Sequence, residues 1–262
     1  MSLLDNPLIT SILFYPRLDT PGGSHLPNVI DSTIPVEDGI VLGYRLYLHE
    51  PGKPVVLFFH GNGEIASDYD NISAYFQNAG ASLLVVDYRG YGWSTGKPKA
   101  SFLQTDTEAV FAALPDILKA ANLAESPLYV MGRSLGSAPA IYLAHLHPQS
   151  FKGIIIESGF AHVLPLLARL GLPAQILGSI PDPVGNVSKM QELDLPLLVI
   201  HGVRDNLIPI ANGETLYQAS PAAQKRLVKI AAAGHNDLLY YGIREYFDAI
   251  AEFINATSQT NS

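Results

Sequence analysis

The stretch that decides the fold of this chain is LYVMGRSLG, from Leu128 to Gly136. Its apolar start, Leu128–Met131, is typical of a strand buried on both faces of a sheet. The pattern Gly-x-Ser-x-Gly follows at once, and a helix-like stretch, Leu135–Leu146, comes after it. A sharp turn between strand and helix lifts a serine hydroxyl above the sheet edge, and small neighbours let the two elements approach closely. We therefore predict that the Ser134 hydroxyl is placed to act as a nucleophile.

Similar apolar runs recur along the chain, and helix-like stretches separate them. The runs are Val55–Phe59, Ser82–Val86, Leu128–Met131, Gly153–Ile156, Leu197–Ile200 and, less clearly, Arg226–Ile230, while Gly39–His49 alternates as an antiparallel strand does. The helix-like stretches are Ser67–Asn78, Ser101–Ala121, Leu135–Leu146, Ile210–Ala219 and Tyr241–Ile254. This alternation predicts an α/β fold in one domain over residues 1–262, with about eight strands in a mostly parallel sheet and helices on both faces.

The composition excludes several classes of protein. With 48% hydrophobic and 15% charged residues, the chain can fill a large core. Its formal net charge of −8 repels phosphate backbones, so we expect no nucleic-acid partner. The absence of cysteine excludes disulfides, thiolate metal sites and a cysteine nucleophile, and it fits a reducing, cytoplasmic location.

The amino-terminal residues lack a basic segment followed by a long apolar run, and no run of about 20 apolar residues occurs in the chain. We therefore expect neither a signal peptide nor an integral membrane segment. The short apolar stretch Pro7–Pro16 has two interpretations: it packs on the domain, or it makes a shallow contact with a membrane.

A serine hydroxyl is a poor nucleophile until a base takes its proton, and the chain offers eight histidines as that base. His235 lies in a loop between the last predicted strand and the last predicted helix, at the sheet edge where it can reach Ser134. His60 and His201 end buried strands, where we expect them to hold loops in place. We predict His235 as the base.

The base needs a carboxylate that fixes its tautomer and stabilises its charged form. Asp205 follows a buried run and gives the chain order Ser, Asp, His that this chemistry shows in α/β sheets. Glu157 is the rival, because it ends another buried run and also precedes His235. We predict Asp205 as the acid.

Acyl transfer builds negative charge on a carbonyl oxygen, which two N–H donors should meet. The first predicted donor is the main-chain N–H of Leu135, directly after Ser134. The second should come from the loop after Val55–Phe59, where we choose the N–H of Asn62, with Gly63 as the next candidate.

Two glycine-rich patterns fail as nucleotide sites. Gly90–Gly96 has the wrong spacing for a dinucleotide fingerprint, and Gly96-Lys97 is followed by Pro98 where a phosphate loop needs Ser or Thr. His145 and His147 are two positions apart and lack a third ligand. We expect no cofactor and no metal.

The segment from Gly159 to Val187 interrupts the alternation of strands and helices. It is rich in Leu, Pro and Gly and carries Leu164, Leu166, Leu167, Leu170, Leu172, Ile176, Leu177 and Ile180. A long insertion at the carboxyl end of a strand is typical of a lid or a binding loop. The competing interpretation is that it simply packs over the sheet.

The order of these motifs resembles one branch of the α/β-hydrolase superfamily, namely small serine hydrolases similar to the protein depalmitoylases and often labelled serine aminopeptidase-like. The motifs are His60-Gly61-Asn62-Gly63, Asp87–Gly96, Gly132–Ser137, His201–Asp205 and Gly234–Asp237, within a match over about Gly39 to Ile254. The resemblance implies the α/β-hydrolase fold, a catalytic triad of Ser134, Asp205 and His235, and no cofactor.

These expectations favour hydrolysis of carboxylic esters or thioesters through an acyl-enzyme, with an apolar acyl group suggested by the segment 159–187. The substrate would be a small molecule or an acylated partner. Amidases or peptidases, acyltransferases and cofactor-free perhydrolases use the same triad and stay open. A binding protein on a hydrolase scaffold is the alternative from a different class.

Overall fold

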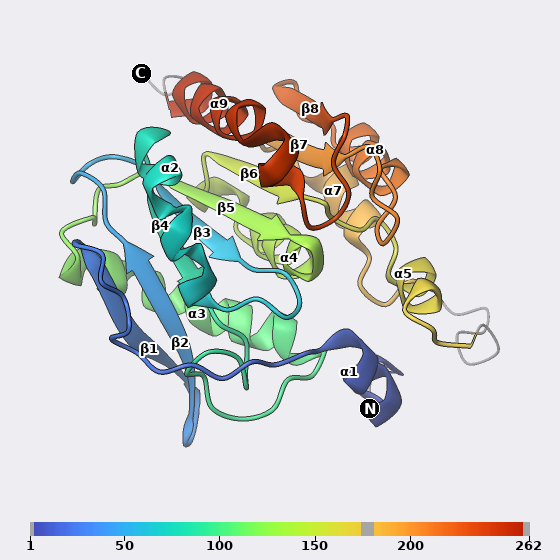
Figure 1. Cartoon of the computed structure of the whole chain (residues 1–262), viewed down its shortest axis with the longest axis horizontal. Coiled ribbons are helices and arrows are strands. Elements are labelled where there is room, and N and C mark those ends of the chain that lie inside the picture. The colour runs from blue at the N-terminus through green and yellow to red at the C-terminus, as the bar shows by residue number, and fades with distance from the viewer. Residues whose placement is uncertain (1–2, 174–180, 259–262) are drawn as a thin grey trace.

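An eight-stranded mixed sheet forms the centre of the computed structural model, which describes residues 3–173 and 181–258 (Figure 1). The strands are β1 (Val29–Glu37), β2 (Ile40–Tyr47), β3 (Val55–Phe59), β4 (Ser82–Val86), β5 (Leu128–Arg133), β6 (Gly153–Glu157), β7 (Leu197–Gly202) and β8 (Lys225–Ile230). Their order is β1-β2-β4-β3-β5-β6-β7-β8. Strand β2 runs antiparallel to β1 and β4, and every other pair is parallel. The prediction of a mostly parallel α/β sheet is confirmed.

The central strands are apolar throughout because both of their faces are covered. All five residues of β3 are buried. Val55, Leu57 and Phe59 pack into the core on one face of the sheet. Val56 and Phe58 alternate with them and pack into the core on the opposite face.

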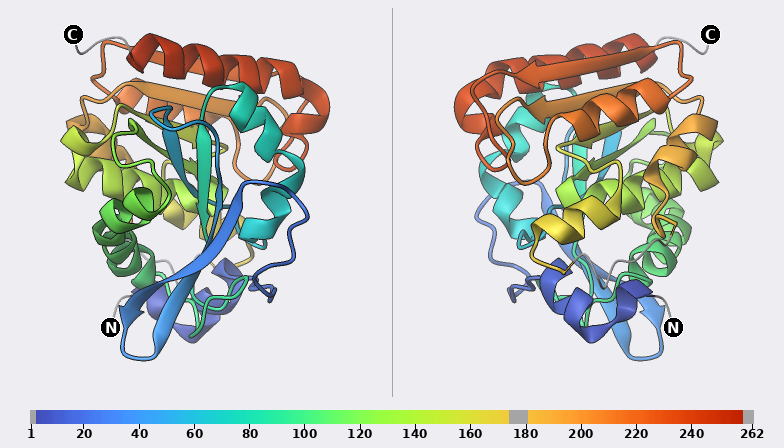
Figure 2. Two further views of the ribbon diagram at one scale, coloured as in Figure 1. Left: turned by 90° about the vertical axis from the view of Figure 1, so that its left-hand side faces the viewer. Right: turned by 90° about the vertical axis from the view of Figure 1, so that its right-hand side faces the viewer.

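Helices cover both faces of the sheet (Figure 2). One face carries α3 (Phe102–Ala120), α4 (Ser137–Leu146), α7 (Asn186–Glu192) and α8 (Ala211–Ala219). The other face carries α2 (Ser73–Asn78) and the last helix, α9 (Leu238–Ser258). Short 3-10 turns are η1 (Leu3–Asp5), η2 (Ala66–Asn71), η3 (Ser134–Gly136) and η4 (Pro148–Ser150). The predicted helix over 67–78 is therefore two elements, η2 and α2.

Strand β1 is the element that the sequence did not indicate. It contains polar residues and Pro35, and most of its side chains are at least partly exposed. The segment becomes a strand by pairing with β2, and the register of this pairing is irregular between Pro35 and Glu37. A strand at the sheet edge can carry a proline because it lacks a partner on its outer side.

The amino-terminal helix α1 (Pro7–Leu13) packs on the domain, as one of the two interpretations predicted. The side chain of Asn6 accepts the N–H of Leu8 at 2.9 Å and so caps the helix. Ile9 and Leu13 are buried, and the helix lies beside α5 (Val163–Arg169) (Figure 1). Within the described residues, no helix has the length and apolar character to cross a membrane.

The described part of the insertion 159–187 packs against the main core. Leu166 and Leu167 of α5 and Leu172 are buried in it, and Leu164 and Leu170 are partly buried against it. Ile176, Leu177 and Ile180 lie outside the described residues. The lid function stays a prediction.

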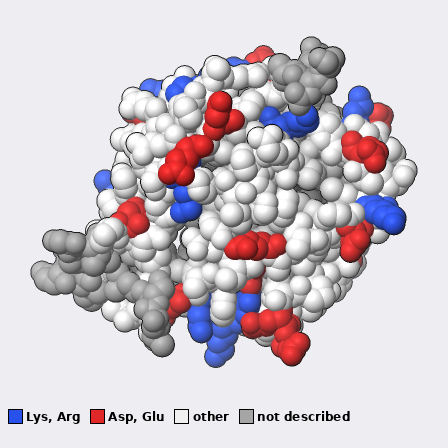
Figure 3. Space-filling model, turned by 180° about the vertical axis from the view of Figure 1, so that it is seen from behind, with Lys and Arg blue, Asp and Glu red and all other residues white. Residues whose placement is uncertain are grey.

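Charged side chains of both signs are scattered over the face shown in Figure 3, with wide uncharged areas between them. On this face, Lys and Arg do not gather into the stripe that a nucleic-acid backbone would require.

Candidate active site

The turn at Ser134 depends on two very close approaches of the backbone. A Cβ on Gly136 would lie 1.9 Å from the carbonyl oxygen of Phe59, and one on Gly132 would lie 2.2 Å from the carbonyl oxygen of Gly136. Neither position can hold a side chain while α4 packs on β3 and β5. Ser134 itself has a φ of +52°, a left-handed conformation that costs a non-glycine residue about 1–2 kcal/mol.

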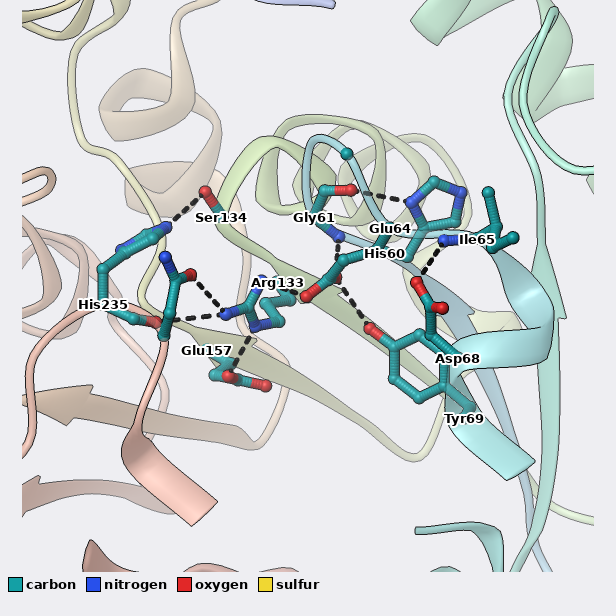
Figure 4. Close-up of polar contacts among 12 residues, drawn as sticks. His60, Gly61, Glu64, Ile65, Asp68, Tyr69, Arg133, Ser134, Glu157 and His235 are labelled. Carbon is teal, nitrogen blue, oxygen red and sulfur yellow. Dashed lines mark hydrogen bonds and ion pairs between the residues drawn. The ribbon is translucent and has the colours of Figure 1, made fainter. Parts of the chain in front are cut away.

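The structure brings the three predicted side chains together at the carboxyl edge of the sheet. The Oγ of Ser134 lies 2.9 Å from Nε2 of His235 (Figure 4). On the other side of the imidazole ring, Nδ1 lies 2.7 Å from Oδ2 of Asp205. Asp205 follows β7 and His235 follows β8, so parallel neighbours deliver both groups to one edge. This geometry allows a proton to pass from the serine hydroxyl to the imidazole.

Asp205 is buried, and both of its carboxylate oxygens have hydrogen-bond partners. Its Oδ1 accepts the main-chain N–H groups of Leu207 and Ile208 at 2.9 and 2.7 Å. Burial alone would raise the pKa of this carboxyl group. Hydrogen bonds with His201 and His235, and the N–H of Ile208, outweigh burial and hold the pKa well below its usual range. Asp205 is therefore ionised and can serve as the counter-ion when the imidazole of His235 is protonated.

The rival carboxylate, Glu157, has other partners. Its Oε1 accepts a hydrogen bond from Nε of Arg133 at 2.9 Å, and its Oε2 accepts one from the hydroxyl of Tyr246 at 2.7 Å. Nδ1 of His235 faces Asp205 instead. His201 holds a loop, because its Nε2 lies 2.7 Å from the carbonyl oxygen of Ile208.

Hydrogen bonds from two tyrosines fix the loop after β3 at Asn62. The side-chain oxygen of Asn62 accepts the hydroxyl of Tyr91 at 2.7 Å and the N–H of Tyr15 at 2.8 Å. Within the described residues, no hydrogen bond takes up the N–H of Asn62 or of Leu135. Both predicted donors are thus left available.

Arg133 is the important residue at this site that sequence analysis missed. It is nearly buried and contacts Glu64, Glu157, the main-chain oxygen of His235 and the side chain of Asn236 (Figure 4). The sequence did carry one signal for its role, because Arg133 is a charged residue inside a turn whose tight packing favours small residues.

A cavity of about 160 Å³ reaches the turn at Leu135, the residue directly after Ser134. It is lined mainly by apolar side chains: Leu4, Leu13, Ala100, Ser101, Leu103, Gln104, Leu135, Ala138, Pro139, Tyr142, Phe160, Val163, Leu166, Pro183, Val184 and Lys189. Helices α1, α3, α4 and α5 all contribute to it, so its wall is built from segments far apart in sequence. A cavity lined in this way can hold an apolar group.

No cluster of three or more His, Asp or Glu side chains that could hold a metal ion occurs in residues 3–173 and 181–258.

Residues 50–181 match the family model described as serine aminopeptidase, S33. A vertebrate relative points to the same superfamily: the α/β hydrolase domain-containing protein 17C of Xenopus tropicalis is 29% identical over 84% of this chain and 67% of its own length. The chain belongs to the serine aminopeptidase S33 family. This places it among the hydrolases of the α/β-hydrolase superfamily and confirms the family resemblance drawn from the ordered motifs.

Two further proteins are similar over most of the chain. An uncharacterised protein of Mycobacterium tuberculosis is 30% identical over 90% of this chain and 82% of its own length. The Pyrococcus furiosus esterase Pf2001 superimposes with a TM-score of 0.72 at 21% identity, over 93% of this chain and 98% of the esterase. The second likeness confirms the α/β-hydrolase fold.

The buried charge of Asp205 makes a pH-dependent contribution to stability. Its pKa in the folded chain lies below the ordinary 3.8, so its stabilising effect is complete above that value and declines as the pH falls toward the folded-state pKa. We expect the free energy of unfolding of wild type to exceed that of Asp205→Asn by more at pH 6 than at pH 3, measured by urea titration. Asp116→Asn, at an exposed position of α3, should match wild type at both values. An equal difference for Asp205→Asn at both pH values would contradict this assignment.

Proposed function

We propose that this chain is a serine hydrolase that cleaves carboxylic esters or thioesters with an apolar acyl group through an acyl-enzyme. The observation that carries the proposal is the line of hydrogen bonds from Ser134 through His235 to Asp205 beside an apolar cavity. Its chemistry follows from the atoms that face each other in this line.

In the first half of the reaction, Oγ of Ser134 attacks the carbonyl carbon while Nε2 of His235 takes the hydroxyl proton. Asp205 keeps Nδ1 protonated and stabilises the imidazolium that forms. The imidazolium then gives its proton to the departing alcohol or thiol, which leaves the acyl group on Ser134. In the second half, water attacks the acyl carbon while His235 takes a proton from it. The imidazolium then returns this proton to Oγ of Ser134 as the bond to the acyl group breaks and the acid leaves.

Negative charge on the carbonyl oxygen needs donors during both halves. The N–H groups of Leu135 and Asn62 take this role in the proposal, because neither serves another hydrogen bond in the described residues. Tyr91 supports the second donor by holding the side chain of Asn62. Loss of one such donor typically costs on the order of 10²–10³ in kcat.

The cavity beside Leu135 is the proposed acyl site. It argues for an ester or thioester of an apolar acid over a peptide with a free amino terminus. A free amino terminus would need an unpaired carboxylate, whereas Glu64 and Glu157, the carboxylates that contact the Ser134 turn, are both paired with Arg133. The similarity in fold to the Pyrococcus furiosus esterase adds support to this choice.

Hydrolysis of p-nitrophenyl esters from acetate to palmitate tests the proposal directly. We expect turnover by wild type with a clear optimum of chain length, because the cavity accepts only acyl groups that fit it. The Ser134→Ala variant, measured in parallel, should lose at least about 10³-fold in kcat, in line with losses on removal of a triad residue. Wild-type activity that survives in Ser134→Ala would refute the nucleophile, and no turnover of any ester would favour amide substrates or a non-catalytic scaffold.

The cavity assignment predicts a shift in chain-length preference. Leu166 lines the cavity, whereas Ala168 lies on the same helix with its side chain exposed. Leu166→Phe should move the optimum to shorter acyl chains because the ring takes up space in the cavity. Ala168→Phe, the matched control, should keep the wild-type optimum. An unchanged preference in Leu166→Phe, with activity retained, would place the acyl group elsewhere.

A further inference from the structure

The guanidinium of Arg133 bridges two loops and the end of a strand around the proposed reacting groups (Figure 4). Its Nη1 binds Oε1 of Glu64, from the loop after β3. Its Nε binds Oε1 of Glu157 at the end of β6, at 2.9 Å. Its Nη2 donates to the main-chain oxygen of His235 and to Oδ1 of Asn236, each at 3.1 Å. Arg133 is also bonded through the chain to Ser134.

This arrangement is built for a guanidinium. Only 12% of the Arg133 side chain is exposed, and two carboxylates face it, so the ion pairs lie largely out of water. Burial would raise the pKa of Glu64, but the charge of Arg133, together with His60 and the hydrogen bonds from Gly61 and Tyr69, outweighs burial and lowers that pKa. A Cβ on Gly61 would lie 2.5 Å from Nη1, so the neighbouring loop leaves room for this one group. A planar fork with donors in several directions is specific to arginine.

The network continues from Arg133 to the loop that carries Asn62. Oε2 of Glu64 accepts the N–H of Gly61 at 2.6 Å and the hydroxyl of Tyr69 at 2.9 Å. One side chain thus connects the loop of the proposed oxyanion donor with the loop of the proposed base. The distance between those loops decides whether the base and the oxyanion donors act on one carbonyl group.

We propose that Arg133 is a positioning residue, which holds His235 and the Asn62 loop at fixed positions relative to Ser134. The proposal rests on the proposed function, since it assigns a role within the same reaction. The contacts of Arg133 include none of the residues that line the apolar cavity. Loss of the guanidinium should therefore slow the chemical step and leave acyl binding nearly unchanged.

The test uses a fluorophosphonate reagent, which reacts with the activated serine and requires no knowledge of the substrate. We would measure the rate constant and the final extent of labelling in wild type, Arg133→Met, Arg133→Lys and Asn236→Ala, with Ser134→Ala as the blank. The ester that wild type cleaves best gives kcat and KM for the same variants. Arg45→Met is the matched control, because Arg45 is even more deeply buried and is also paired with two carboxylates, Asp31 and Asp70, but contacts neither the Ser134 turn nor the His235 loop.

We expect Arg133→Met to label about 10–100-fold more slowly but to the same final extent, with a matching fall in kcat and a KM within about threefold of wild type. Arg133→Lys should not restore the rate, since an ammonium cannot reach all the partners at once. Asn236→Ala, which removes a single contact, should fall between wild type and Arg133→Met. Arg45→Met should lower the unfolding temperature and leave the labelling rate unchanged.

Distinct results would overturn the positioning role and the proposed function. Wild-type rates in Arg133→Met, or a loss seen only as a smaller labelled fraction, would make Arg133 a purely structural residue while the proposed function stands. A fall in rate of the same size in Arg45→Met would show a general effect of instability and would also refute the positioning role. Failure of wild type to label at Ser134 would refute the proposed function, and the positioning role with it.

Discussion

The site depends on one steric constraint, the contact between the start of α4 and the ends of β3 and β5. The backbone at Gly136 approaches the carbonyl of Phe59 so closely that no side chain fits between them. This contact forces a turn too sharp for ordinary backbone angles, and Ser134 takes the left-handed conformation at its tip. The packing of a whole helix on the sheet offsets the local strain, so the serine hydroxyl is held where His235 reaches it.

Buried charge then fixes the groups around that turn. Asp205 stays ionised because two main-chain N–H groups and two histidines face its oxygens, and these contacts outweigh the cost of burial. Arg133 stays ionised between Glu64 and Glu157 for the same kind of reason. Buried ion pairs add little net stability compared with apolar packing, but they accept very few alternative geometries. Such groups suit a site where relative position matters more than stability.

Much of the fold could be predicted from local sequence patterns. Val55–Phe59 and Ser82–Val86 agree with β3 and β4 in both bounds, because a strand buried on both faces must be apolar throughout. Strand β1 could not be predicted, since polar residues and Pro35 interrupt its apolar ones and it forms through pairing with β2. The partners of Asp205 and Glu157 likewise follow only from the structure, in which Asp205 faces the imidazole of His235 and Glu157 faces Arg133.

Other features of the site depend on contacts between distant segments, which no local pattern records. The Arg133 network joins residues up to 103 positions apart, and the apolar cavity combines α1 with α5. The sequence predicted that the apolar insertion would matter to the acyl group, but the contribution of α1 and α3 to the same cavity follows from the fold alone.

The most direct test of the central claim is to trap the acyl-enzyme. Wild type mixed with an excess of its best p-nitrophenyl ester is quenched in acid within milliseconds, digested and analysed by mass spectrometry. We expect one acyl group on the peptide that contains Ser134, absent from Ser134→Ala and removed from wild type as the ester is used up. An acyl group on another residue, or steady turnover with no acyl group on that peptide under conditions where deacylation is slower than acylation, would contradict the central claim.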